Sequence, residues 1–287
     1  MADSLEVKNL GKRYARFSLK DVSFSIPSGY IMGFVGPNGS GKTTTIKSIL
    51  GFAGDAPGVV NLLGHDGETA TDLFDDIGVV MDEPLYVDEW RISTVEKAVS
   101  PFYGRWDKAA FDGLLKTFGI DRKKKVKELS RGMKVKLSMA VALSHGARLL
   151  VLDEPTSGLD PVARDELCGL LLDFIAGDEN RGVLFSTHIT ADLERIADYI
   201  TFILDGRIVY TGDKEELMEK YVMVKGGPGE IDDGHKGLII GLREHGTGFE
   251  GMIETADIGK LPKTLLFERA SLDEIIIHIN NGEKLHD

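Results

Sequence analysis

Apolar and polar positions alternate in short runs over residues 5–35, as in LEVKNL, LKDVSFSI and YIMGFVG. This alternation predicts strands, joined by turns at Gly11 and at Pro27–Gly29. Strand patterns then recur at 59–64, 77–81, 149–153, 182–187 and 199–205, and helix patterns near 42–50, 94–103, 108–118, 131–145, 161–176 and 190–197. Several of these strands are nearly continuous apolar runs, which is typical of a parallel sheet buried on both faces. The chain is therefore expected to have an α/β fold.

Two regions depart from this alternation of helix and strand. Residues from about 85 to 146 contain helix patterns without a strand between them, which predicts a helical insertion. The composition changes near residue 221, where GGPGEIDDGHKG predicts a loop, KTLLFER a strand and SLDEIIIHINNG a helix. The isoleucines of the last segment favour a strand, but Ser271 and Glu274 have the spacing of a capping box. We therefore divide the chain into a domain of residues 1–220 and a small α+β appendage of residues 221–287.

Composition excludes several classes of protein. The net charge of −12 counts against a nucleic-acid partner, which would need a broad basic surface. Cys168 is the single cysteine, so no internal disulfide and no cysteine-based metal cluster can form, and a reducing cytosol is expected. No apolar run approaches the ~20 residues of a membrane helix, and MADSLEVKNLGKRY lacks the apolar core of a signal peptide.

The segment GPNGSGKTT matches the phosphate-binding pattern G-x-x-x-x-G-K-[ST] between a predicted strand and a predicted helix. Glycines let the backbone N–H groups turn toward phosphate oxygens, and the helix N-terminus adds its dipole. Lys42 is expected to reach the terminal phosphates, and the Thr43 hydroxyl to ligate Mg²⁺. The complete loop comprises Gly36, Pro37, Asn38, Gly39, Ser40, Gly41, Lys42, Thr43 and Thr44.

A second motif, LLVLDEP, places two acids at the end of a buried strand. Asp153 is positioned to hold Mg²⁺, and Glu154 to polarise a water for attack on the terminal phosphate. Downstream, Asp160 followed by Pro161 is a sufficient N-cap on structural grounds alone. His188 follows the strand VLFST, where it could serve as a capping or buried histidine or could reach a phosphate.

The segment KELSRGMKVKL (127–137) concentrates basic residues at the start of a predicted helix. The helix dipole disfavours cations there, so Arg131, Lys134 and Lys136 require an explanation. One interpretation is a solvated basic face. The other is an anion site at Ser130 and Gly132, in which case the unfavourable charge would be relieved only when the anion binds.

The ordered set of the phosphate loop, LSRGM, LLVLDEP, SGLD and TH resembles the nucleotide-binding subunit of an ATP-binding cassette (ABC) transporter over about residues 4–220. The resemblance implies a P-loop ATPase core with a parallel sheet, an antiparallel β subdomain and a helical subdomain at about 85–146. It implies that Gly36–Thr44 is the Walker A loop, Asp153 the Walker B metal ligand and Glu154 the base. Tyr14 would stack on adenine, Ser157–Asp160 would form the D-loop at a dimer interface, and His188 would sense the γ-phosphate.

Two segments depart from the family pattern. Asp82 stands where the Q-loop glutamine is expected, and its carboxylate could approach Mg²⁺. The signature, usually LSGGQ, carries Arg131 and Met133, while Ser130 and Gly132 are retained. In the family this segment binds the γ-phosphate held by a second nucleotide-binding subunit. The Gly-Met variant resembles cassettes that pair with simple six-helix exporter-type membrane subunits.

The resemblance also predicts partners and location. Glu83–Arg105 lies where the family docks its separate transmembrane subunit, at the cytoplasmic face of the membrane. The aromatic residues there could anchor that partner or form the core of the helical subdomain; they are Tyr86, Trp90, Phe102 and Tyr103. Two other functions stay open: a soluble ABC-superfamily ATPase with a mechanical or regulatory role, and a P-loop kinase, which would leave LSRGM, SGLD and His188 without a role.

Overall fold

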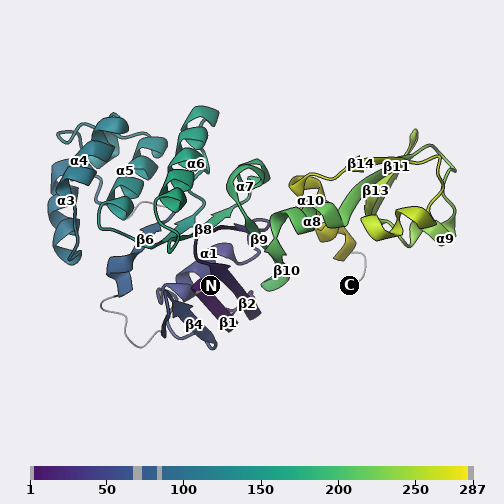
Figure 1. Cartoon of the computed structure of the whole chain (residues 1–287), viewed down its shortest axis with the longest axis horizontal. Helices are drawn as coiled ribbons and strands as arrows, with labels where there is room; N and C mark the ends of the chain where they lie inside the picture. Colours follow the sequence, from purple (N-terminus) through teal and green to yellow (C-terminus); the bar gives the residue numbers. More distant parts are fainter. Residues whose placement is uncertain (1–2, 67–72, 83–85, 284–287) are drawn as a thin grey trace. The chain divides into compact units, whose positions relative to one another are not determined.

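The computed structural model describes residues 3–66, 73–82 and 86–283. Its contacts divide the chain into two compact units, Met1–Thr211 and Gly212–Asp287. The sequence placed the division at residue 220, so helix α8 (Lys214–Lys220) groups with the second unit instead of the first. Figure 1 shows the elements of each unit.

A six-stranded sheet forms the centre of the first unit, in the order β10-β9-β3-β8-β7-β6. Its strands are β3 (Ile31–Val35), β6 (Ile77–Val80), β7 (Leu149–Asp153), β8 (Gly182–Thr187), β9 (Tyr199–Leu204) and β10 (Arg207–Asp213). The four pairings of β3 with β8 and β9, and of β7 with β6 and β8, are parallel. Every residue of β3, β7 and β8 is buried, as the continuous apolar runs predicted.

A second, antiparallel sheet has the order β2-β1-β4-β5. It comprises β1 (Asp3–Arg13), β2 (Ser18–Pro27), β4 (Val59–Leu62) and β5 (His65–Asp66). The predicted turn at Gly11 is wrong. Gly11 lies inside β1 and donates its N–H to Pro57 O at 2.8 Å, and the chain turns after Arg13, where Tyr14 N donates to Phe17 O at 2.8 Å. Single glycines in strands are compatible with close backbone approach, which the alternation pattern cannot distinguish from a turn.

Helix α1 (Lys42–Ile49) packs against both β1 and β7, and therefore joins the two sheets. Buried apolar residues of both sheets and α1 form one continuous core. Helices α6 (Pro161–Ala176) and α7 (Thr190–Ile196) contact β8 and β3, respectively. The phosphate-loop segment thus enters a helix that is fixed at the junction of two sheets.

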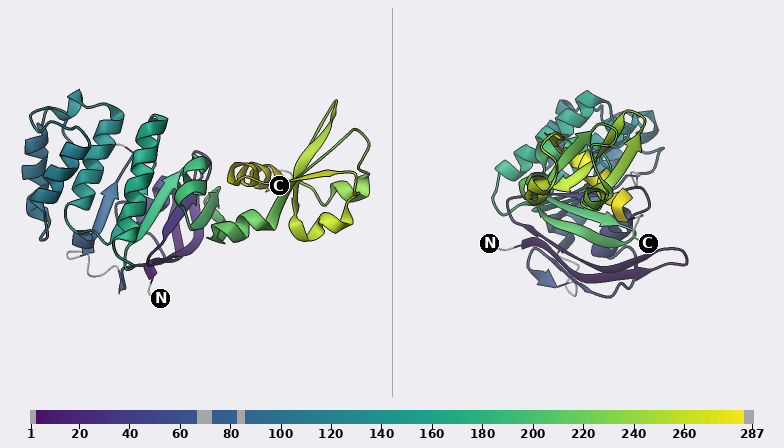
Figure 2. Two further views of the ribbon diagram at one scale, coloured as in Figure 1. Left: turned by 45° about the horizontal axis from the view of Figure 1, so that its top comes forward. Right: turned by 90° about the vertical axis from the view of Figure 1, so that its right-hand side faces the viewer.

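Residues 86–146 form the predicted helical subdomain (blue to teal in Figures 1 and 2). It contains α3 (Ile92–Val99), η2 (Ser100–Phe102), α4 (Lys108–Thr117), η3 (Val126–Glu128) and α5 (Arg131–Leu143). The helix expected at 94–103 begins two residues earlier and changes to a 3₁₀ turn at Ser100, because Pro101 has no N–H to continue an α-helix. The subdomain has its own apolar core, which includes Ile92, Phe111 and Leu137.

The four aromatic residues of this region differ in their burial. Tyr86 and Tyr103 pack against the core of the subdomain. Phe102 is 83% exposed and Trp90 is 36% exposed. The core interpretation therefore fits Tyr86 and Tyr103, while the rings of Phe102 and Trp90 are the more exposed ones.

The second unit contains a four-stranded antiparallel sheet in the order β12-β13-β11-β14 (green to yellow in Figure 2). Its elements are α8, β11 (Tyr221–Gly226), α9 (Asp233–Lys236), β12 (Ile240–His245), β13 (Gly248–Glu254), η4 (Thr255–Lys260), β14 (Leu266–Arg269) and α10 (Leu272–Glu283). The capping box is confirmed: Ser271 N donates to Glu274 Oε2 at 2.9 Å, and Glu274 N to Ser271 Oγ at 3.2 Å. The segment expected to be entirely loop includes the single helical turn α9.

Candidate functional site

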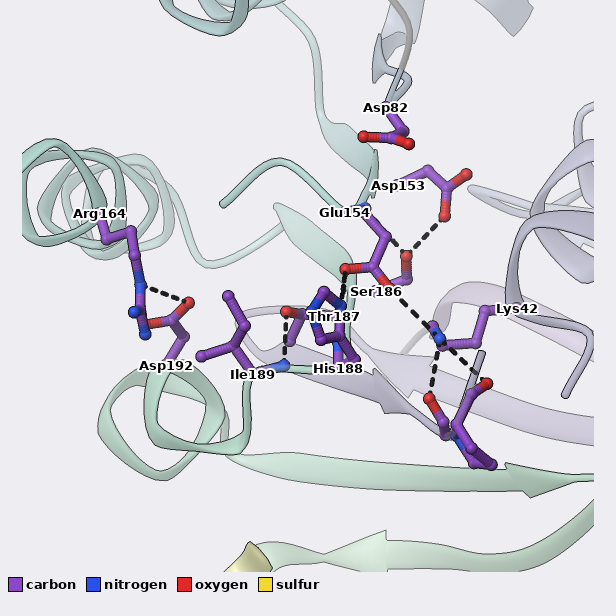
Figure 3. A network of polar contacts seen from close by, with 12 residues as sticks. Lys42, Asp82, Asp153, Glu154, Arg164, Ser186, Thr187, His188, Ile189 and Asp192 are labelled. Carbon is purple, nitrogen blue, oxygen red and sulfur yellow. Dashed lines mark hydrogen bonds and ion pairs between the residues drawn. The ribbon is translucent and has the colours of Figure 1, made fainter. Parts of the chain in front are cut away.

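The carboxyl ends of β3, β6, β7 and β8 meet at one edge of the six-stranded sheet. Asp153 at the end of β7 pairs in register with Ser186 on β8, and Val35 at the end of β3 pairs with Thr187. The phosphate loop follows β3, Glu154 follows β7 and His188 follows β8. Ligands of open α/β sheets bind at such an edge, and Figure 3 shows these side chains converging there.

The phosphate-loop backbone requires glycine at two positions in particular. A Cβ on Gly36 would lie 2.3 Å from Ile203 O, and Gly41 has a φ of 115° at the N-cap of α1. The Ser40 hydroxyl, in the same loop, is buried and has no hydrogen-bond partner among the described residues. A loop that leaves a buried hydroxyl unpaired is consistent with an added acceptor such as a phosphate oxygen.

Lys42 and His188 both pair with Glu154. The Lys42 ammonium lies 3.2 Å from Glu154 Oε1 and donates to Gly36 O at 2.8 Å. His188 Nδ1 lies 2.7 Å from Glu154 Oε2. Lys42 is 6% and Glu154 11% exposed, so this charge pair is largely withdrawn from water, where electrostatic interactions are strong. The structure therefore brings together the three residues that the sequence assigned to catalysis.

Asp153 is buried and accepts a hydrogen bond from Ser186 Oγ at 2.7 Å. Burial raises the pKa of the Asp153 carboxyl, hydrogen bonds with Ser186 and Thr43 lower it, and the nearby charges of Glu154 and Asp82 raise it. Desolvated carboxylate beside a threonine hydroxyl is a hard oxygen donor set of the kind that Mg²⁺ takes. The residues present therefore fit the predicted cation.

Glu154 has a backbone φ of 50°, which is uncommon for a residue other than glycine. Its N–H donates to Ser186 O at 3.0 Å and to Ser186 Oγ at 3.1 Å, so β8 fixes this conformation. Strained backbone held by its surroundings is found preferentially at functional sites. The strain here is located on the predicted base.

A pocket of about 640 Å³ opens beside these groups. Its lining comprises Arg16, Phe17, Asn38, Gly39, Gly41, Lys42, Thr43, Thr44, Asp82, Glu154, Ser157 and His188. Tyr14 is not in this set and is 48% exposed, whereas Phe17 lies on the pocket wall against Gly41. The aromatic side chain on the pocket wall is therefore Phe17, three residues after the predicted Tyr14.

Ser130, Gly132 and Asp160 lie outside the lining of this pocket, at the N-termini of α5 and α6. The Ser130 hydroxyl caps α5 by accepting from Met133 N at 3.3 Å, and Asp160 Oδ1 caps α6 by accepting from Val162 N and Ala163 N, both at 3.0 Å. A Cβ on Gly132 would lie 3.2 Å from Leu159 Cδ2, so the signature and the SGLD segment pack against each other.

The expectation that the start of α5 carries unrelieved positive charge is wrong. Arg131 pairs with Asp82, Lys134 Nζ lies 3.0 Å from Asp88 Oδ1, and Lys136 pairs with Glu166. Upstream, Glu89 pairs with both Lys125 and Lys127, and their hydrogen bonds lower the pKa of the Glu89 carboxyl to about 2. These partners are 30 or more residues away in the sequence, so the local pattern could not reveal them.

The sequence missed three residues of the site. Ser186 binds both Asp153 and Glu154, and pairing the ends of the two strands LLVLD and GVLFST would have identified it. Arg16 and Phe17 line the pocket, and the signal for them was the break in alternation after Arg13.

Comparison with known proteins agrees with this geometry. Residues 19–157 match the family model described as ABC transporter. The lantibiotic transport ATP-binding protein SrtF of Streptococcus pyogenes is 32% identical over 233 residues, which cover 76% of this chain and 97% of SrtF. The chain belongs to the ABC transporter family. It is an ATP-binding subunit, and its chemical activity is ATP hydrolysis coupled to transport.

Two further matches extend this result. The bacitracin transport ATP-binding protein BcrA of Enterococcus faecalis is 28% identical over 290 residues, covering 98% of this chain and 92% of BcrA. A solved ATP-binding subunit of an ABC transporter aligns with a TM-score of 0.67 at 28% identity, covering 74% of this chain and 91% of that one. The predicted fold class, with its mixed sheet, antiparallel sheet and helical subdomain, is therefore confirmed.

Proposed function

We propose that this ABC subunit hydrolyses ATP between two nucleotide-binding subunits and thereby drives export through a separate membrane subunit. The observation that carries the proposal is the convergence of Lys42, Glu154 and His188, beside buried Asp153, at the mouth of a pocket of about 640 Å³. That volume and the polar lining suit a nucleoside triphosphate.

Glu154 is proposed to be the general base that accepts the proton of the attacking water. Its two oxygens contact Lys42 Nζ and His188 Nδ1, so both side chains hold the carboxylate in one orientation. Lys42 is placed to neutralise the terminal phosphates, and His188, 45% exposed, to contact the γ-phosphate. Positioning and charge stabilisation of this kind account for most catalysis of phosphoryl transfer.

Thr43 and Asp153 are proposed to hold Mg²⁺, which when bound would neutralise charge on the phosphate oxygens. The sequence added Asp82 to this set. Asp82 Oδ1 is engaged by Arg131, which leaves Oδ2 as the oxygen for any approach to a cation. The phosphate-loop residues Gly36–Thr44 would supply the backbone donors around the triphosphate, and the Tyr14–Phe17 turn the aromatic surface for adenine.

Ser130, Gly132 and Asp160 are proposed to act across a dimer interface, because they lie together but outside this chain's own pocket. The N-terminus of α5 offers free N–H groups to an anion, in this case the γ-phosphate held by a second subunit. Homodimers and heterodimers both satisfy this geometry.

The partner membrane subunit is proposed to dock on the helical subdomain at the exposed rings of Phe102 and Trp90. None of the helices in the described part of the chain has the length and apolarity needed to cross a bilayer. The subunit would then be held peripherally at the cytoplasmic face of the membrane through that partner. The export direction rests on the Gly-Met signature, and relatives named for lantibiotic and bacitracin transport are compatible with it.

The test is the ATPase activity of the purified chain and of Glu154→Gln. Loss of a general base lowers the rate by about 10²- to 10⁴-fold, while binding of ATP should be retained. Hydrolysis by the variant at the wild-type rate would refute the assignment of Glu154.

A further inference from the structure

Asp82 in the Q-loop and Arg131 in the signature are two of the three residues at which this chain departs from the pattern of its family, the third being Met133, and the two bind each other. Asp82 follows β6, and Arg131 is the first residue of α5. The ion pair therefore connects the edge of the central sheet to the start of the signature helix.

Arg131 also touches the SGLD segment. A Cβ on Gly158 would lie 3.2 Å from Arg131 Cδ, 3.3 Å from Nε and 3.5 Å from Cζ, so the guanidinium and its stem lie against the Gly158 backbone. Gly158 has a φ of 71°, a conformation that suits glycine. One side chain thus contacts the end of β6 and the loop before α6 at the same time.

Asp82 belongs to the nucleotide pocket, where its carboxylate adds to that of Glu154 and to that of Asp153 buried beside the pocket. Figure 3 shows it beside Asp153 and Glu154, and it lines the pocket together with Lys42, Thr43 and His188. A terminal phosphate that reaches Lys42 would come close to all three acids. Glu154 contacts the Lys42 ammonium and the His188 ring, and Arg131 is the counter-ion that the described residues supply to Asp82.

We propose that Arg131 is a positioning residue of this chain's own ATP site, which balances the charge of Asp82 so that the pocket accepts a terminal phosphate. This inference rests on the proposed function. It reverses the role that the sequence suggested for Arg131, because the positive charge acts in cis, on the pocket of its own chain, instead of on the phosphate of a partner.

Substitutions of Arg131 and of Asp82 are predicted to change the affinity for ATP in opposite directions. Arg131→Gln leaves Asp82 unbalanced and should weaken ATP binding about three- to tenfold, the range expected for unit charges near a partly exposed site. ADP, which lacks the terminal phosphate, should be affected less. Asp82→Asn should instead tighten ATP binding, and the double variant should return to within about twofold of wild type, because the two charges are removed together.

The experiment measures the dissociation constants of fluorescent ATP and ADP analogues by anisotropy, on the full chain, in the presence of EDTA. Chelation removes any contribution of Asp82 as a metal ligand. Lys134→Gln is the matched control, since it removes one cation from the same helix but its partner Asp88 does not line the pocket. Arg131→Lys should restore most of the ATP affinity, because the charge is kept.

The alternative is that the Asp82–Arg131 ion pair only stabilises the fold. In that case both single variants would lower the melting temperature and would weaken ATP and ADP alike, which overturns the proposal. If Arg131→Gln does not fold, tighter ATP binding by Asp82→Asn still supports it, and unchanged or weaker binding refutes it. Failure of the wild-type chain to bind ATP would instead count against the proposed function.

Discussion

Phe17 is the aromatic side chain on the wall of the nucleotide pocket, and Tyr14, three residues earlier in the same turn, is half exposed outside it. Base–aromatic stacking contributes about 1–3 kcal/mol, so Phe17→Ala should weaken ATP binding about five- to 150-fold. Tyr14→Ala is expected to have a smaller effect. Titration of both variants with a fluorescent ATP analogue shows which of the two rings contacts the base. A larger loss of affinity for Tyr14→Ala than for Phe17→Ala would favour Tyr14, as the family resemblance implies.

How well single residues could be predicted depends on how far apart in the sequence their interaction partners lie. Lys42, Asp153 and Glu154 were identifiable because each has a fixed place relative to the end of a strand and the start of a helix. Their mutual contacts follow from the parallel register of the strands. The pairing of Asp82 with Arg131 spans 49 residues and two elements, and no local pattern encodes it.

At the scale of elements, Asp160 has two assigned roles that can be separated. Its carboxylate caps α6 through Val162 and Ala163, which by itself would explain an aspartate before Pro161. Asp160→Ala should lower the free energy of unfolding by about 1 kcal/mol, and Asp160→Asn, which keeps the acceptor, should not. Denaturant unfolding measures this difference.

A role of Asp160 at a dimer interface makes a further prediction. The stable Asp160→Asn variant should then form the ATP-dependent dimer less well than wild type. Wild-type dimerisation by Asp160→Asn would restrict Asp160 to capping.

A second element-scale test concerns His145, two residues after the end of α5. The ring is fully buried, stacks on Tyr103 with centroids 4.0 Å apart, and contacts Asp75 O through Nδ1 at 3.0 Å. Burial lowers the pKa of His145, the contact with Asp75 raises it and the charge of Arg105 lowers it. Its Nε2 has no partner among the described residues, so protonation would leave a buried charge unpaired.

The sign of the pH dependence follows from that direction. Below about pH 6.5 the unfolded chain binds a proton at this histidine that the folded chain does not, so stability should fall as the pH falls. The contribution is at most about 1.4 kcal/mol per pH unit. His145→Phe, which keeps the stacked ring, should reduce the slope of unfolding free energy against pH between 6.5 and 5. Equal slopes in the two proteins would contradict this.

Elements were more predictable than their connections. The bounds of helix α6 and of strands β7 and β8 were predicted to the residue. The two strands are nearly continuous apolar runs, and Asp160-Pro161 is a strong signal for the start of α6. In the second unit, by contrast, β11, β12 and β13 were not predicted as strands. β11 pairs with the distant β13, while β12 and β13 form a local antiparallel hairpin. Glycines at 226, 241, 248 and 251 interrupt the alternation that would have indicated these strands.

At the scale of the whole molecule, the candidate site residues of this chain lie on two different surfaces. The pocket contains Lys42, Glu154 and His188, while Ser130 and Gly132 face outward at the start of α5. In the proposed function, a second copy or a homologous subunit would complete the phosphate environment. The second unit lies within the matched region of the bacitracin transport relative, which covers 98% of this chain.

The most direct measurement is the molar mass of Glu154→Gln in solution, by light scattering, with and without ATP and Mg²⁺. We expect a monomer without nucleotide and a dimer with ATP that persists, because the variant binds ATP without hydrolysing it. Lys42→Ala is the control that should remain monomeric, since it lacks the cation for the terminal phosphates. A Glu154→Gln chain that binds ATP yet stays monomeric at every nucleotide concentration would contradict the two-subunit site.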